Sequence, residues 1–403
     1  MTKWAILLGA MALAAACGGS GAPRAGASGD DGGQAGVDAA NPVDAGGGAD
    51  GGASDGASDA AGDSAGPSCA PTSLAGIQVA TVTGANNPLD PLGYPPYALD
   101  GCTLVYVAPA APGQTSGELR RRDLSTGNET PLAPASEQPR RPAIAGDLIA
   151  WEAVVAGASI VRVSKAGQTT TVTGPFVQAG EPRVTGDAVV FTAWLTSDSA
   201  GDTDVYLYLP ASTQLVAVAT GPGQQRFADV SASYVAVSDF SEDPTGAFSP
   251  DTLRLADVAV FDRMTLARTL RHLPGKQAFP MLGSGTHLGY LDWNLVNPEP
   301  KFSAYGVMVG TVTSDPTTDG NVKGTGQVQV NTPYVRPSVR ADWIEWVDES
   351  TGGGGLFRRP LDLSQAFTST LGGVQLLGPV AGQPMTIVLA SSAGGYALTG
   401  VTH

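Results

Sequence analysis

The chain has 403 residues, a formal net charge of −15 and a sequence isoelectric point of about 4.5. Such an acidic chain argues against nucleic acid as a partner, because phosphate binding needs clustered Lys and Arg. Gly and Pro supply 54 and 30 residues, about a fifth of the chain, and no long segment after the N-terminus has helical periodicity. The composition indicates an all-β protein with many short strands and tight turns.

Residues 1–17 have the layout of an export signal. Lys3 precedes an apolar run from Trp4 to Ala16, which is too short to span a hydrocarbon core. The run ends at Leu13-Ala-Ala-Ala-Cys17, which resembles the lipobox of bacterial lipoproteins. In that family the cysteine becomes the mature N-terminus and carries the acyl chains, so the resemblance implies lipidation at Cys17. Gly18, in place of Asp, implies export to the outer membrane. An ordinary signal peptide with an incidental cysteine is the alternative.

Residues 18–68 consist almost entirely of Gly, Ala, Ser and Asp, with eight Asp, one Arg and no aromatic residue. Such a segment buries too little apolar surface to offset its ordering entropy, so we expect a disordered linker. As a flexible coil its root-mean-square reach is about 40 Å. The segment is interpreted as a solvated tether between the lipid and the folded domain.

Two further cysteines, Cys69 and Cys102, stand 33 positions apart. An even pair in an exported protein favours a disulfide, here between the start of the folded domain and its first hairpin. Two free thiols are the alternative.

One short pattern recurs seven times between Pro96 and Leu398. It consists of a polar residue, Pro, an apolar-polar alternation, a small residue or Gly, and a β-rich run. Its copies end at Tyr106, Trp151, Phe191, Val237, Tyr290, Trp346 and Leu398, in steps of 45, 40, 46, 53, 56 and 52 residues. This spacing is typical of β-propeller blades.

Each copy supplies two strands, and a third and fourth strand follow in most repeats. Residues 69–403 are therefore predicted to form a seven-bladed β-propeller of four-stranded blades, with six blades as the alternative. The segment Ile77–Thr83 alternates like a strand and is expected to complete the last blade, which lacks an outer strand.

The repeats resemble those of TolB-like and broader WD-repeat-like propellers. The resemblance rests on Asp204-Val-Tyr206, on Asp123-Leu-Ser-Thr-Gly127 and on the run from Pro142 to Gly146. It implies the fold over about 330 residues, and it does not imply an activity, since propellers host many functions.

The sequence contains no catalytic motif. Its three histidines have no metal-ligand spacing, and neither a Cys-x-x-Cys pair nor a nucleophile elbow is present. His272 and His287 are expected in strands or loops of adjacent repeats. We therefore predict no catalytic residue, no metal site and no cofactor.

Polar residues recur immediately before the first strand of several blades. Since equivalent positions of successive blades form a ring, we expect these side chains near one mouth of the central channel, where they would bind an anionic or polyhydroxylated ligand. Pairing of these side chains with one another across blade interfaces is the alternative. The predicted ring consists of Arg141, Glu181, Arg226, Arg336 and Gln383.

Together these features predict a monomeric, lipid-anchored propeller on the outer membrane, facing the periplasm or the cell surface. Its expected role is a non-catalytic binding or protein-interaction scaffold for an envelope protein or glycan. The alternative is an envelope enzyme that acts on a polysaccharide or peptidoglycan fragment at the channel mouth.

Overall fold

The computed structural model describes residues 69, 74, 76–79, 92–110, 116–197, 201–242, 256–293, 304–324, 327–329, 336–350, 354–372, 376–381, 385–392 and 395–402. All of them belong to one compact unit, Gly62–His403. The signal segment, Cys17 and the linker to residue 68 lie outside the described residues. No helix in the described ranges is long and apolar enough to cross a membrane.

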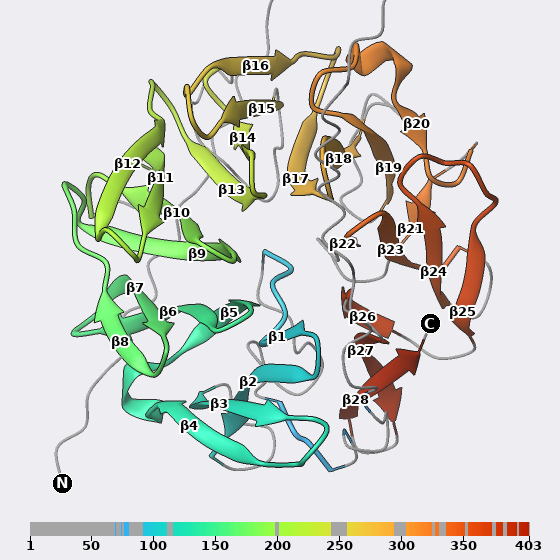
Figure 1. The fold of residues 1–403 in the computed structure, drawn as a ribbon. Coiled ribbons are helices and arrows are strands. Elements are labelled where there is room, and N and C mark those ends of the chain that lie inside the picture. The colour runs from blue at the N-terminus through green and yellow to red at the C-terminus, as the bar shows by residue number, and fades with distance from the viewer. Residues whose placement is uncertain are drawn as a thin grey trace, which may run out of the picture. The chain divides into compact units, whose positions relative to one another are not determined.

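Seven antiparallel sheets surround a common centre, each formed by consecutive strands (Figure 1). Blades 1 to 3 contain β1 (Tyr97–Asp100), β2 (Thr103–Pro109), β3 (Gly117–Asp123), β4 (Glu129–Ala133), β5 (Arg140–Ala145), β6 (Leu148–Val155), β7 (Ala158–Lys165), β8 (Gln168–Thr171), β9 (Gln178–Thr185), β10 (Ala188–Trp194), β11 (Thr203–Leu209) and β12 (Gln214–Ala219). Blades 4 and 5 contain β13 (Gln225–Val230), β14 (Tyr234–Asp239), β15 (Asp257–Asp262), β16 (Arg268–Arg271), β17 (Gln277–Leu282), β18 (His287–Asp292), β19 (Ala304–Thr311), β20 (Gly320–Asn321) and β21 (Val328–Gln329). Blades 6 and 7 contain β22 (Ser338–Arg340), β23 (Trp343–Asp348), β24 (Gly355–Pro360), β25 (Thr368–Gly372), β26 (Leu376–Val380), β27 (Met385–Ser392) and β28 (Gly395–Thr402). Two short 3-10 turns, Ala135–Glu137 and Pro316–Thr318, lie between strands.

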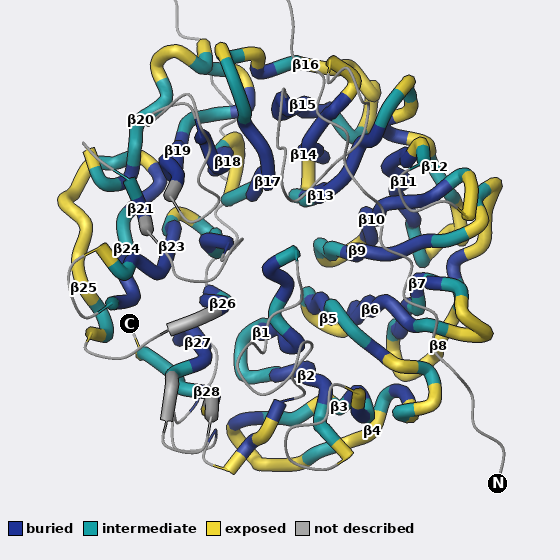
Figure 2. Tube along the Cα trace, turned by 180° about the vertical axis from the view of Figure 1, so that it is seen from behind, coloured by how far each residue is buried: buried dark blue, intermediate teal, exposed yellow. Residues whose placement is uncertain are grey.

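The prediction of seven blades is confirmed. The first strand of each blade faces the centre, and the second and third strands are the most buried, whereas outer strands such as β8 and β16 are largely exposed (Figure 2). Trp151, Phe191 and Trp346 each lie on the second strand of their blade and are at most 1% exposed. The recurring aromatic position of the sequence is therefore the packing position between blades.

The last repeat differs from its predicted register. Pairing of Val380 with Ile387 matches that of Arg183 with Val190, so Val388 rather than Leu398 is the counterpart of Phe191. The pattern is displaced because the bulge of β26 lies at Gly378-Pro379, five residues ahead of the Pro384 used in the sequence alignment. Three strands form blade 7 among the described residues.

The described residues of the segment that was expected to close the last blade do not form a strand. Ile77, Gln78 and Val79 have no strand conformation, although Ile77 and Val79 are buried; residues 80–83 lie outside the described ranges. The disulfide between Cys69 and Cys102 is present, as predicted, and ties the segment ahead of β1 to the first hairpin. Blades 1 and 7 are joined by the Tyr97 hydroxyl, which donates to the carbonyl oxygen of Gly378 at 2.5 Å.

Candidate functional site in the central channel

A cavity of about 180 Å³ lies at the centre of the propeller, lined by the inner strands of all seven blades. Most of the residues that line it are apolar, but a few polar side chains also reach its surface. The polar side chains on the wall come from blades 3, 4 and 6 and are Arg183, Asp229, Arg336, Ser338 and Arg340.

Five of the inner strands carry a β-bulge, namely β5, β9, β13, β17 and β26. The register shifts there, and a residue with positive φ stands just before the Pro or its equivalent. A non-glycine residue in this conformation costs about 1–2 kcal/mol, and bulges of this kind re-aim side chains. The positive-φ residues are Arg141, Glu181, Phe227, Phe279 and Gly378, with φ between 50° and 58°.

This bulge position corrects the predicted ring in two blades. Arg141, Glu181 and Arg336 do precede an inner-strand Pro. In blade 4, however, the bulge residue is Phe227, and Arg226 stands one residue earlier. In blade 7 the position belongs to Gly378, and Gln383 lies outside the described residues.

Glu181 is the centre of a buried ion-pair network. It is fully buried, and its Oε1 forms a short ion pair with Arg226. The Arg141 guanidinium lies 3.8 Å from the same oxygen and 2.9 Å from Glu152. Thr192 donates to Glu181 at 2.9 Å. Burial raises the pKa of Glu181, but Arg226 and Arg141 outweigh it and hold the pKa at about 2. These residues satisfy one another across blade interfaces, which was the alternative to ligand binding.

The chain ahead of β1 projects toward the centre of the ring (Figure 1) and places Tyr94 among several guanidinium groups. The ring of Tyr94 is buried, and three guanidinium carbons lie over it: Arg336 at 4.0 Å, Arg183 at 4.8 Å and Arg141 at 5.0 Å. Stacking of this kind satisfies the planar faces of guanidinium groups and leaves their edges available for hydrogen bonds.

Arg183 and Arg336 are the cations of this group that form no ion pair with a described carboxylate. Arg336 donates to the carbonyl oxygen of Leu92 at 3.1 Å and lies 4.2 Å from the centre of the Phe279 ring. Within the described ranges, neither Arg183 nor Arg336 has a carboxylate oxygen within 4 Å. Burial lowers the pKa of Arg336, nearby Arg183 lowers it further, and Tyr94 partly offsets both.

The other charged groups of the wall are already engaged. Arg340 forms a short ion pair with Asp100, and the Asp229 carboxylate accepts from the backbone N–H of Leu282 at 2.7 Å. Burial raises the pKa of Asp229, and the Arg183 guanidinium on the same wall offsets this in part. The channel therefore offers donors for an anion chiefly through Arg183 and Arg336, with Ser338 as a neutral neighbour.

Sequence reasoning missed Arg183 and Asp229 because it read the position before the Pro. The residue after the Pro lines the channel, and this position holds Ala143, Arg183 and Ser338. Each of them pairs with the residue directly before the packing position on the second strand. The repeat therefore did contain this position, two residues further along the strand than the position that the prediction used.

No protein-family model and no curated protein matches the chain. Among solved structures, the β-propeller domain of the Trilobed protease from Pyrococcus furiosus aligns at 9% identity over 76% of this chain and 93% of that chain, with a TM-score of 0.57. Acylaminoacyl peptidase from Pyrococcus horikoshii aligns at 9% identity over 75% of this chain and 50% of that chain, with a TM-score of 0.53. TolB from Acinetobacter baumannii aligns at 15% identity over 68% of this chain and 64% of that chain, with a TM-score of 0.45. The chain thus spans about half to two thirds of the length of two of these structures, and the similarity to the first two shows that it has a β-propeller fold.

Proposed function

We propose that this protein is a lipid-anchored envelope scaffold whose propeller binds a partner without catalysis, and that the channel receives an anionic group of that partner. The observation that carries this proposal is the pair Arg183 and Arg336. Both lie on the channel wall of a strongly acidic chain, and no described carboxylate oxygen lies within 4 Å of either guanidinium group. An incoming carboxylate or phosphate would bring a negative charge into direct contact with them and accept the guanidinium hydrogen bonds.

The size of the cavity favours part of a macromolecule over a whole cofactor. Its volume of about 180 Å³ is below the roughly 300–1,000 Å³ of ordinary small-molecule pockets. An acidic side chain, a terminal carboxylate or an anionic substituent of a glycan fits this space. These are groups that an envelope protein or glycan can present.

The charge of the wall also favours binding over glycoside cleavage. Glycoside hydrolases generally use two carboxylates that flank the bond to be cleaved. Among the described wall residues, Asp229 is the one carboxylate.

The envelope location rests on the sequence. The run that ends at Cys17 and the linker of residues 18–68 fit an acylated N-terminus with a long tether. In this proposal the acyl chains hold the protein on the outer membrane, and the linker gives the propeller a reach of about 40 Å.

Capture of partners from membranes tests the binding function. The acylated protein would be purified with its cross-linked partners, and mass spectrometry would quantify them for wild type, Arg183→Gln and Arg121→Gln. Arg121 is an exposed arginine on β3, so Arg121→Gln makes the same charge change away from the channel. We expect Arg183→Gln to lose the principal partner and Arg121→Gln to retain it.

Equal recovery by Arg183→Gln and wild type would contradict a role for the channel. The membrane part of the proposal is tested separately with Cys17→Ser, which should leave the membrane fraction or remain unprocessed. Wild-type membrane binding by Cys17→Ser would contradict the lipid anchor.

A further inference from the structure

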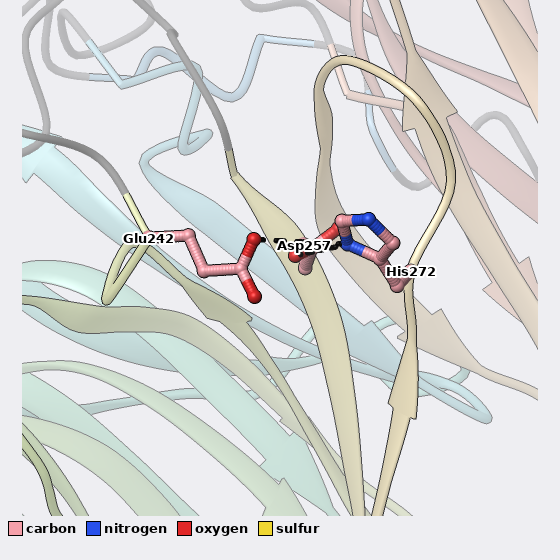
Figure 3. Close-up of side chains that lie close together, drawn as sticks. All are labelled: Glu242, Asp257 and His272. Atoms are coloured by element: carbon pink, nitrogen blue, oxygen red, sulfur yellow. Dashed lines mark hydrogen bonds and ion pairs between the residues drawn. The ribbon is translucent and has the colours of Figure 1, made fainter.

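Blade 4 brings together three metal-ligating side chains from separate parts of its sequence. Glu242 follows β14, Asp257 begins β15 and His272 follows β16 (Figure 3). Asp239 pairs with Asp257 and Val258 pairs with Arg271, so these three strand ends meet at one edge of the sheet. The cluster could not be recognised as a motif, because its members stand at positions 242, 257 and 272.

The distances fit a small cation with short bonds. His272 Nδ1 lies 3.0 Å from Asp257 Oδ2 and 3.8 Å from Glu242 Oε2, and one donor atom of each residue lies within 4.8 Å of the others. Bonds of about 2.0–2.2 Å in tetrahedral geometry place neighbouring ligand atoms about 3.3–3.6 Å apart. Small rotations of the Glu242 side chain, which is 53% exposed, would bring its oxygen to that separation.

The charges of the cluster also fit a divalent ion. Asp257 is buried, and a buried carboxylate is normally paired with a cation or bound to a metal. The nearby Arg268 guanidinium is bound to Asp239 at 2.6 Å. In the described part of the chain, His272 is the basic side chain that contacts Asp257 and Glu242. Two carboxylates and a neutral imidazole would balance a double positive charge.

We propose that Glu242, Asp257 and His272 form a binding site for a divalent transition-metal ion, with Zn²⁺ as the best match. One imidazole nitrogen and two carboxylate oxygens are ligands that Zn²⁺ accepts, whereas Ca²⁺ and Mg²⁺ select oxygen ligands alone. Three protein ligands leave a fourth position for water. His272 and Glu242 are 61% and 53% exposed, so that position is open to solvent.

Competition between the full-length protein and a chromophoric zinc chelator tests this site. We expect wild type to bind one Zn²⁺ at this site, and Asp257→Asn, His272→Ala and Glu242→Gln each to weaken its binding at least tenfold. Glu242→Gln changes an exposed side chain and should leave the thermal unfolding of the metal-free protein unchanged, so it remains informative if the buried Asp257→Asn variant folds poorly.

A matched control exists in blade 5. His287 Nδ1 lies 3.9 Å from Asp342 Oδ1 and hydrogen-bonds to the carbonyl oxygen of Ser284. This His–Asp pair lacks a third ligand in the described ranges. His287→Ala should therefore bind Zn²⁺ as wild type does. Ca²⁺ at millimolar concentration should not displace Zn²⁺ from wild type.

A zinc-edge anomalous difference map would locate the ion. We expect one peak among Nδ1 of His272 and the two carboxylates. The proposal is overturned if wild type and Glu242→Gln bind Zn²⁺ equally, if His287→Ala loses as much affinity as His272→Ala, or if the anomalous peak lies elsewhere.

Discussion

The arginines near the channel divide into two groups with different surroundings. Arg141 and Arg226 are joined to the buried carboxylates of Glu152 and Glu181. Arg183 and Arg336 stack on Tyr94 and line the cavity, and no described carboxylate oxygen lies within 4 Å of either guanidinium group. The same residue type is thus structural in one group and available for a ligand in the other. The nearest carboxylate, rather than the position in the repeat, decides which role an arginine has.

The largest effect is expected from removing the shared carboxylate. Glu181→Ala leaves the buried guanidinium of Arg226 without its ion-pair partner, and breaking a buried pair costs about 3–5 kcal/mol. Urea unfolding measures this loss. Glu118, which forms a surface ion pair with Arg120, is the control, and Glu118→Ala should cost about 0–1 kcal/mol. Equal losses would show that the Glu181 network does not hold the blades together.

Removal of the disulfide should cause the next largest loss in the free energy of unfolding. Cys69–Cys102 closes a loop of 33 residues that contains Tyr94, and the chain-entropy model gives about 3–4 kcal/mol for such a loop. We expect Cys69→Ser with Cys102→Ser to lose this much stability in urea unfolding. A loss below about 1 kcal/mol would mean that other contacts fix the segment carrying Tyr94.

Low pH should reduce the free energy of unfolding by protonating Glu181, the carboxylate paired with Arg226 and Arg141. The pKa of Glu181 is about 2, below its ordinary value of 4.5, so its stabilising contribution is complete above pH 4.5. That contribution is lost as the pH falls from 4.5 toward 2, and amounts to about 3 kcal/mol. Unfolding free energies measured across this range should fall more steeply for wild type than for Glu181→Gln. Parallel pH profiles would contradict the depressed pKa.

The smallest change in stability is expected at Arg183. It has no ion pair to lose in the described part of the chain, so Arg183→Gln should shift the unfolding free energy by less than about 1 kcal/mol. A loss as large as that of Glu181→Ala would show that Arg183 stabilises the fold as Arg141 and Arg226 do. The proposed difference between these two pairs of arginines would then be wrong.

The sequence predicted the repeat, the blade number and the packing positions, because these depend on strand alternation, which is local. Trp151 and Trp346 are buried where the repeat places them. The disulfide was predictable from the pairing of two cysteines. Blade 7 was misaligned because the bulge residue of its inner strand is Gly378 rather than a polar residue.

The channel could be predicted only in part. Arg336 was found, but the bulge at Arg226–Asp229 moved Phe227 into the ring position of blade 4. Whether an arginine is paired depends on carboxylates from other blades: Glu181 and Arg226 are 45 residues apart. Such long-range pairs leave no periodic signal in one sequence.

The central claim is that the channel binds an anionic group through Arg183. Malonate, a dicarboxylate that is small relative to the cavity, can be titrated calorimetrically into wild type, Arg183→Gln and Arg121→Gln. The account predicts saturable binding to wild type and Arg121→Gln, and at least tenfold weaker binding to Arg183→Gln. Identical titrations of wild type and Arg183→Gln would contradict it.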